Sequence, residues 1–277
     1  MVPSPTLTLA GGVAMPRLGY GLYKVPPADA ERLAAEALAA GYRSLDTAAM
    51  YGNEEGVGRA VARAVEAGMH REEVFVTTKV WNTDHGYDAA LRAFERSRAA
   101  LGLDVVDLLL IHWPCPARGL YTETYRALET LLAEGRVRAI GVSNFQPEHV
   151  RRLVDECTVV PAVNQIELHP YLQQHGLREL HAELGISTEA WSPLARGHVL
   201  DDPVLAEIAR AHGVTTAQAV IRWHLEEGRI VIPKASDPER IRSNADVFGF
   251  ALTEEERWRI ASLDRGFRSG SHPDAVN

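Results

Sequence analysis

The sequence predicts an α/β fold, a closed (β/α)8 TIM barrel, and three observations lead to this class. Short β-rich runs alternate with amphipathic segments, which favours parallel strands joined by right-handed crossovers. Eight such runs fit within 277 residues, as a barrel of this type requires. Several helical segments end on glycine, which adopts the left-handed backbone of a helix terminus. An open doubly wound sheet is the alternative for the same pattern.

The eight predicted strands cover residues 17–21, 42–48, 74–80, 105–113, 138–144, 160–168, 185–193 and 229–235. The segments between them have helical periodicity. In residues 54–68, for example, apolar side chains recur at Val57, Ala60, Val61 and Ala64. The glycines that should end helices are Gly41, Gly68, Gly102, Gly135 and Gly185.

Three segments stand outside this repeat. Residues 6–18 resemble a β-hairpin with a Gly-Gly turn, and residues 201–213 and 253–264 should form two extra helices. The tail, residues 265–277, has no periodicity and should be irregular. No linker rich in proline or serine divides the chain, so we expect a single domain over residues 1–277.

Composition excludes several classes of partner. The net charge of −8 argues against nucleic acid or an anionic membrane as the main partner. Two cysteines, Cys115 and Cys157, are no disulfide framework and fit a reducing compartment. The start of the chain lacks the pattern of a signal peptide, and residues 106–113, the longest apolar run, are too short to cross a bilayer. We therefore expect a cytoplasmic protein whose partner is a small molecule, and we also expect a monomer.

Four titratable residues fall where a barrel carries its chemistry, at the carboxyl ends of strands. Asp46 ends the second predicted strand, Lys79 lies near the end of the third, and His112 ends the fourth. Tyr51 lies in the loop after the second strand. Each residue alone is compatible with a structural role, as an ion pair, a core histidine or a packed tyrosine. Together they form a coherent chemical group.

A phenol has a pKa near 10 and is a poor proton donor at neutral pH. We expect the ammonium of Lys79 to lower the pKa of Tyr51, with Asp46 holding the lysine in place. His112 can orient a carbonyl oxygen by a hydrogen bond. This group suits protonation of an oxygen on which negative charge develops, as when a hydride is delivered to an aldehyde or ketone.

The motifs around these residues resemble those of the aldo-keto reductase family, within it the bacterial 2,5-diketo-gluconate reductase-like branch. They occur in order as LDTAAMYGNE, TTKVWN, LIHWP, GVSNF, NQIELHP, WSPLARG, IPK and PERIRSN. The resemblance covers nearly the whole chain. It implies the catalytic tetrad Asp46, Tyr51, Lys79 and His112, with Tyr51 as general acid in the reduction of aldehydes and ketones.

The resemblance also implies a nicotinamide cofactor, although the Gly-rich dinucleotide fingerprint is absent. Residues 56–61, GVGRAV, lack its third glycine, and we interpret them as helix packing. Three polar residues should bind the nicotinamide carboxamide, Trp191 should stack on its ring, and the loop from Ser192 should follow the pyrophosphate. The implied cofactor contacts are Gly21, Leu22, Ser143, Asn144, Gln165, Trp191, Ser192, Leu194, Gly197, Lys234, Ser236, Arg240 and Asn244. Without the resemblance, these would be strand ends, core aromatics and solvated charges.

The expected cofactor is NADPH, with NADH also accepted. Lys234 and Arg240 flank the start of a predicted helix, where an anion such as a phosphate binds favourably. The family has hydroxyl residues after its IPK motif, whereas this chain has Ala235 and Asp237, which should weaken the preference for NADPH. Ser236 can replace one hydroxyl contact, and Asp237 can cap the helix that begins at Pro238.

Four aromatic or apolar residues beside the tetrad in sequence should form the substrate wall: Tyr23, Met50, Trp81 and Trp113. The short tail suggests an open pocket for varied carbonyl compounds. Two other functions are considered: a nucleotide-binding sensor or accessory subunit with little turnover, and a metal-dependent lyase or isomerase. The 11 histidines show no pairing at ligand spacing, so we expect no metal site.

Overall fold

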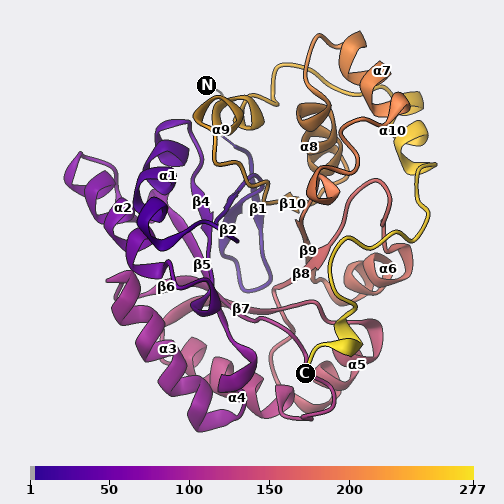
Figure 1. Ribbon diagram of the computed structural model, residues 1–277. Helices are drawn as coiled ribbons and strands as arrows, with labels where there is room; N and C mark the ends of the chain where they lie inside the picture. Colours follow the sequence, from indigo (N-terminus) through magenta and orange to yellow (C-terminus); the bar gives the residue numbers. More distant parts are fainter. Residues whose placement is uncertain (1–3) are drawn as a thin grey trace.

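The structure, a computed structural model, describes residues 4–277. Eight parallel strands form one sheet in the order β3-β4-β5-β6-β7-β8-β9-β10, and helices surround it (Figure 1). The strands are β3 Tyr20–Gly21, β4 Ser44–Asp46, β5 Phe75–Val80, β6 Val106–Ile111, β7 Val137–Ser143, β8 Val163–Glu167, β9 Ser187–Trp191 and β10 Ile230–Val231. Each overlaps one of the eight predicted runs.

The first and last strands meet and close the sheet into a barrel. Leu18 and Val231 form a parallel bridge. The amide of Gly19 donates to the carbonyl of Val231 at 2.9 Å, and that of Gly21 donates to Pro233 at 3.1 Å. The prediction of a closed barrel is therefore confirmed over an open doubly wound sheet.

Glycine is required at this junction because the two strands approach closely. A Cβ atom at Gly19 would lie 2.9 Å from a methyl carbon of Ile232, and one at Gly21 would lie 3.2 Å from the carbonyl oxygen of Ile232. A larger side chain at either position would push β3 away from the segment that follows β10.

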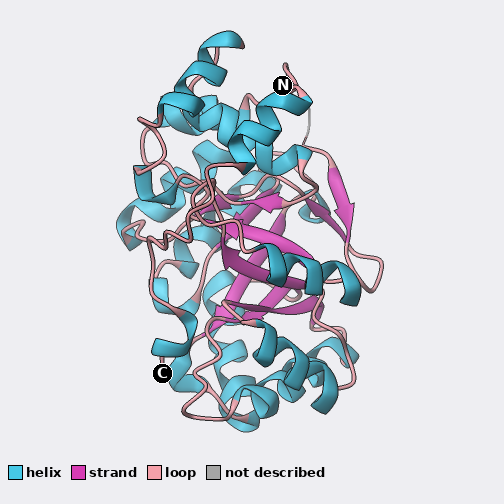
Figure 2. Cartoon of the chain, turned by 90° about the vertical axis from the view of Figure 1, so that its right-hand side faces the viewer, coloured by secondary structure: helices cyan, strands magenta, loops and turns pink. Residues whose placement is uncertain are grey.

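The helices form the outer layer of the barrel in both views (Figures 1 and 2). They are α1 Pro27–Ala39, α2 Glu54–Glu66, α3 Tyr87–Leu101, α4 Tyr121–Ala133, α5 Pro147–Glu156, α6 His175–Leu184, α8 Thr216–Glu226 and α9 Pro238–Ala245. The two predicted extra helices are α7 Pro203–Ala211 and α10 Glu254–Ala261. The five glycines predicted to end helices all have positive φ, from 63° at Gly102 to 103° at Gly68.

Helix α2 shows how the apolar pattern fixes these contacts. Val57, Ala60 and Val61 are buried on one face, as the periodicity predicts. Gly58 lies on the same helix, where a Cβ atom would collide with the backbone carbonyl of Leu101. The segment GVGRAV therefore packs a helix, as interpreted from the sequence.

The N-terminal hairpin closes one end of the barrel. Strands β1 Thr6–Thr8 and β2 Ala14–Pro16 pair antiparallel, as predicted. Leu9 and Met15 from this hairpin are buried in one cluster with interior side chains of the barrel, among them Phe75 and Leu108. This end is filled with apolar side chains, so the opposite end, at the carboxyl ends of the strands, is available for a binding site.

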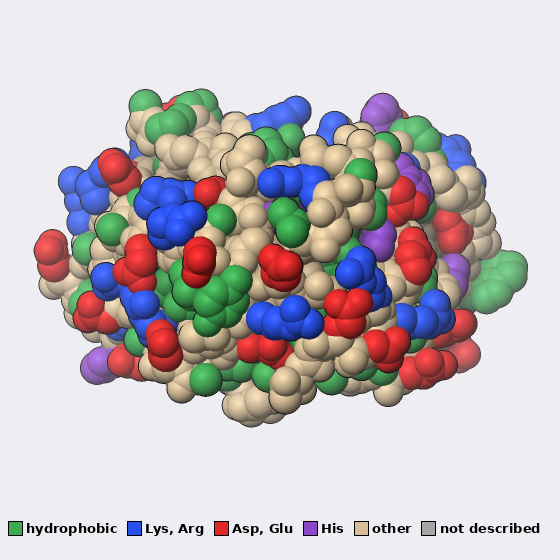
Figure 3. Space-filling view, turned by 90° about the horizontal axis from the view of Figure 1, so that it is seen from below, with side chains coloured by type: hydrophobic (Ala, Val, Ile, Leu, Met, Phe, Trp, Pro, Cys, Tyr) green, Lys and Arg blue, Asp and Glu red, His purple; other side chains and the backbone are tan. Residues whose placement is uncertain are grey.

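The surface carries charges of both signs. On the face seen in Figure 3, lysine and arginine side chains are interspersed with aspartate and glutamate. Across residues 4–277, no helix has both the length and the apolar character needed to pass through a bilayer.

Residues 265–277 contain only one short 3-10 turn, η5 Pro273–Ala275. The segment nevertheless packs on the barrel. Glu167, at the end of β8, is buried and accepts hydrogen bonds from the backbone and hydroxyl of Ser269, each at 2.6 Å. Figure 1 shows this segment, in yellow, running from α10 to a C-terminus near α5.

Candidate active site

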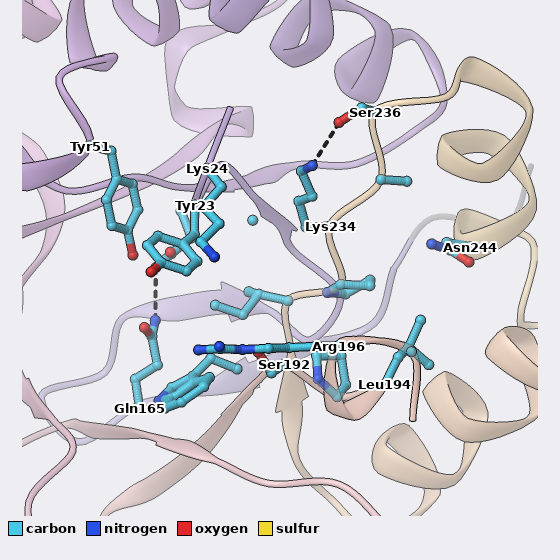
Figure 4. Close-up of a pocket in the computed structure, with 18 of the residues that line it drawn as sticks. Tyr23, Lys24, Tyr51, Gln165, Ser192, Leu194, Arg196, Lys234, Ser236 and Asn244 are labelled. Atoms are coloured by element: carbon cyan, nitrogen blue, oxygen red, sulfur yellow. Dashed lines mark hydrogen bonds between the residues drawn. The ribbon is translucent and has the colours of Figure 1, made fainter. Parts of the chain in front are cut away.

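A cavity of about 1050 Å³ opens at the carboxyl ends of the strands. Its walls come from loops after most of the strands and from the tail. Figure 4 shows Tyr23, Lys24 and Tyr51 toward one end, Ser192, Leu194 and Arg196 along one side, and Lys234, Ser236 and Asn244 farther along. The cavity is therefore elongated, with polar groups at both ends.

The four predicted catalytic residues converge at the inner end of this cavity. The Lys79 ammonium lies 2.7 Å from a carboxylate oxygen of Asp46 and also donates to the carbonyl of Thr47 at 2.9 Å. The same ammonium lies 5.2 Å from the ring centre of Tyr51. The ring centres of Tyr51 and His112 are 5.6 Å apart. Tyr51 is brought there by the turn η1, Ala49–Tyr51, which follows β4.

The ionisation of Tyr51 differs from the sequence-based expectation. Burial and the nearby Asp46 carboxylate raise the pKa of Tyr51 well above its usual value. The expectation of a lowered pKa was wrong, because burial and the Asp46 carboxylate outweigh the effect of the Lys79 ammonium, which is paired with Asp46. Tyr51 is therefore a neutral phenol that keeps its proton at neutral pH.

His112 is also neutral. Burial, followed by the charge of Lys79, holds the pKa of His112 well below its usual range. The imidazole lines the cavity, and its Nδ1 atom is buried without a hydrogen-bond partner among the described residues. A neutral imidazole can donate one hydrogen bond, which is what a carbonyl oxygen in the cavity would need.

Gln165 and Trp191 form the next part of the wall. The indole nitrogen of Trp191 donates to the Asn144 side chain at 2.8 Å, and Asn144 donates to the carbonyl of His112 at 2.9 Å. The tail packs against the edge of the indole, since a Cβ atom at Gly270 would lie 2.5 Å from Cη2 of Trp191. These contacts hold the indole in one orientation in the cavity wall.

The outer end of the cavity is cationic. Lys234 and Arg240 line it, together with Ser236, Asp237 and Asn244. The Lys234 ammonium donates to the Ser236 hydroxyl at 2.7 Å. As predicted, Asp237 caps α9: its carboxylate accepts from the amides of Glu239 and Arg240 at 2.8 and 3.1 Å.

Two predicted site residues do not line the cavity. Leu22 is 0% exposed and lies in the apolar core, and its amide donates to the carbonyl of Asp46. Lys79 lies beneath the cavity wall, where it contacts Asp46 and lies near the ring of Tyr51. The other predicted residues line the cavity: Gly21, Tyr23, Asp46, Met50, Tyr51, Trp81, His112, Trp113, Ser143, Asn144, Gln165, Trp191, Ser192, Leu194, Gly197, Lys234, Ser236, Arg240 and Asn244.

Sequence reasoning missed several lining residues. Lys24 and Arg196 are cations in loops on opposite walls, and both have positive φ, at 59° and 55°. Ser271 and Val276 come from the tail, so this segment forms part of the wall although it is short. Arg196 lies within the recognised WSPLARG motif and Lys24 follows Tyr23, so both cations could have been proposed from their positions in the sequence. The tail contains no recognised motif from which its lining residues could have been proposed.

One group of potential metal ligands occurs within residues 4–277, and it lies at the start of α5, away from the cavity. It consists of Glu148, His149 and Asp274. The Nδ1 atom of His149 accepts from the amide of Gln146 at 3.2 Å, and burial lowers the pKa of this histidine. Its proton therefore sits on Nε2, the atom that faces the two carboxylates. This geometry fits a helix cap rather than a metal ligand.

The family model for the Aldo/keto reductase family matches residues 12–265. The chain belongs to this family. An aldo-keto reductase of Mycobacterium sp. (strain KMS) is 53% identical over 274 residues, covering 99% of this chain and 98% of that protein. Glyoxal reductase of Bacillus subtilis (strain 168) is 47% identical, covering 98% of this chain and 97% of that protein.

Solved structures agree with this assignment. A crystal structure of a Gox0644 mutant in complex with NADPH superposes with a TM-score of 0.93 at 47% identity, covering 99% of both chains. The expected family, fold and enzyme class are confirmed: the chain is an aldo-keto reductase and hence an oxidoreductase.

Proposed function

We propose that this aldo-keto reductase uses NADPH to reduce aldehydes and ketones to alcohols, with Tyr51 as the general acid. One observation carries this proposal. A neutral, half-buried phenol lies beside the Lys79–Asp46 ion pair and the neutral imidazole of His112 at the inner end of a large cavity. This group can give a proton to an oxygen without itself needing a low pH.

The residues present fit a nicotinamide cofactor. Gly21 leaves room beside the backbone of Ile232 that a Cβ atom would fill, and Trp191 offers a fixed flat surface. The outer end supplies the cations Lys234 and Arg240 beside the start of α9, which suits a phosphate. When bound, the reduced nicotinamide supplies the hydride for the reduction.

Each member of the tetrad has a separate part in the reaction. His112 donates a hydrogen bond to the substrate carbonyl oxygen and orients it toward Tyr51. Tyr51 transfers its phenolic proton to this oxygen as negative charge develops there. The Lys79 ammonium, 5.2 Å from the ring centre, stabilises the phenolate that is left, and Asp46 holds the ammonium in place.

The cofactor preference follows from charge at the outer end. Lys234 and Arg240 favour the additional phosphate of NADPH, while Asp237 opposes it. Because the Asp237 carboxylate accepts two backbone amides of α9, part of its charge is directed toward the helix. We therefore propose a preference for NADPH that is weaker than is typical of the family, with measurable NADH activity.

Tyr23, Met50, Trp81 and Trp113 line the cavity near the tetrad and form an apolar, aromatic wall for a small carbonyl compound. We treat residues 1–277 as one reductase domain, which rests on the single eight-stranded sheet, and we propose that it acts as a monomer. The cytoplasm is proposed from the two free cysteines.

The decisive experiment is the Tyr51→Phe variant, which removes one hydroxyl group. General acid catalysis contributes roughly 10²–10⁴-fold, so kcat for an aromatic aldehyde should fall by at least about a hundredfold, while NADPH affinity changes little. Tyr125→Phe is the control, because that phenol is buried on α4 outside the cavity and its hydroxyl has no hydrogen-bond partner among residues 4–277. A loss below about tenfold for Tyr51→Phe would refute the assignment. A wild-type protein that binds NADPH tightly but reduces no carbonyl compound would instead indicate a sensor or accessory subunit.

A further inference from the structure

Glu189 is a buried carboxyl group that the proposed chemistry does not use. It lies in the middle of β9, is 0% exposed, and is the register partner of Gln165 on β8. Its Oε2 atom lies 2.9 Å from the amide nitrogen of Gln165. Its Oε1 atom is buried without a hydrogen-bond partner in the described part of the chain. Burying a carboxyl group in the interior of a barrel costs free energy unless hydrogen bonds or an ion pair offset the loss of water.

Gln165 connects this group to the catalytic residues. Its amide nitrogen also donates to Asp46 at 2.8 Å, on the carboxylate that holds Lys79. A primary amide carries two N–H groups, so the two carboxyl groups use both of them. Figure 4 shows the Gln165 amide at the cavity wall, with its nitrogen engaged in a hydrogen bond. The carbonyl oxygen is the atom left to face a ligand.

The charges of the groups around Glu189 are compatible with a carboxyl group that holds Gln165 in place. Asp46 on β4 and Lys79 on β5 neutralise each other, and the remaining titratable group that faces Glu189 is the phenol of Tyr51. Burial, followed by the Asp46 carboxylate, raises the pKa of Glu189. A protonated Glu189 keeps an oxygen that accepts from Gln165 and adds no net charge.

We propose that Glu189 is a positioning residue of the cofactor site: with Asp46 it fixes the amide of Gln165 so that the carbonyl oxygen faces the cavity and accepts a hydrogen bond from the carboxamide NH2 of the nicotinamide. This inference rests on the proposed function. It assigns the residue that makes the recognition of the carboxamide by Gln165 directional. Without Glu189, one N–H of Gln165 loses its acceptor and the amide can rotate to present that N–H to the ligand.

The test compares two ligands that differ at this group. NADP⁺ has a carboxamide, whereas 3-acetylpyridine adenine dinucleotide phosphate has an acetyl group and no NH2. Dissociation constants are measured from the quenching of tryptophan fluorescence, for the wild type, Glu189→Leu and Glu189→Gln. Glu189→Leu should weaken NADP⁺ binding about tenfold, which corresponds to about 1.4 kcal/mol, and should change binding of the acetyl analogue less than about twofold. Glu189→Gln keeps an acceptor oxygen and should bind NADP⁺ within about threefold of the wild type.

Asp107→Asn is the matched control. Asp107 is a buried strand carboxylate on β6 that pairs with Arg71 and Arg138, outside the cavity. This variant should lower stability but leave both dissociation constants within about twofold of the wild type. Equal weakening of the two ligands by Glu189→Leu, or no weakening of either, overturns the inference while leaving the proposed function intact. A wild type that binds no NADP⁺ overturns both.

Discussion

The charge of Asp237 provides a quantitative test of how this aldo-keto reductase chooses its cofactor. In the structure, the Asp237 carboxylate caps α9 through the amides of Glu239 and Arg240. Replacement by asparagine keeps an oxygen acceptor at the same position and removes the charge. Asparagine is as good a helix cap as aspartate, so the change isolates the electrostatic contribution better than a change to threonine.

The expected change in cofactor preference follows from the exposure of Asp237 to solvent. Asp237 lies at the open outer end of the cavity, where a contact between exposed charges is worth about 1 kcal/mol or less. The ratio of kcat/KM for NADPH to that for NADH should therefore rise about two- to fivefold in Asp237→Asn. Arg240→Ala removes charge-assisted hydrogen bonds worth roughly 1.5–3 kcal/mol, so the same ratio should fall by at least about tenfold.

The assay measures initial rates with both cofactors at low and high ionic strength. The effect of Asp237→Asn should shrink at high salt, because solvent-exposed charges are screened. Unfolding midpoints provide the control that α9 is intact. The reasoning is refuted if the wild type favours NADH, or if Arg240→Ala discriminates as the wild type does, because the phosphate would then bind elsewhere.

Three further predictions concern stability, pH and thiols. Lys79→Met leaves the Asp46 carboxylate buried without its cation and should lower the free energy of unfolding by about 3–5 kcal/mol, as measured by urea denaturation. The double variant with Asp46→Asn should regain stability but not activity, as measured by kcat. The pKa of Tyr51 is raised, and in the proposed mechanism its acid form is the active one. Therefore kcat at saturating substrates should not decline from ionisation of Tyr51 below about pH 10. A decline in kcat centred near about pH 8 that is absent from Tyr51→Phe would contradict this. Burial raises the pKa of Cys115 and of Cys157 to about 11, so iodoacetamide at neutral pH should leave activity unchanged over an hour-long assay.

The barrel was predictable from the sequence because its strands are buried on both faces. In β5 and β6 every residue is buried, and apart from Lys79 and Asp107 these runs consist of apolar or β-branched residues. Polar residues stand out at the ends of these runs, which is why Asp46, Lys79 and His112 could be recognised. Parallel strands bring their carboxyl ends to one rim, so sequence order was enough to predict that these residues meet.

Interactions across the barrel were not predictable in the same way. Glu189 meets Gln165 because β8 and β9 pair in this register, and it lies near Asp46 of β4 only because non-adjacent strands face one another in the closed interior. The pKa of Tyr51 depends on how completely the ring is buried and on the charge left after Lys79 has paired with Asp46. Neither quantity is encoded by local sequence pattern. The tail lacks periodicity, so its contact with Glu167 was equally hidden.

The junction of β3 with the segment after β10 has a consequence for how the protein is made. Gly21 and Arg240 line the same cavity but are separated by most of the chain. While the nascent chain emerges from the ribosome, β3 can pair with β4 early, but its other edge must wait for β10, the last strand to be synthesised. An unpaired edge of this kind is a site for wrong association until the final unit arrives. Any ligand that needs both sides of the junction binds only the completed barrel, so its presence shifts the balance toward finished molecules.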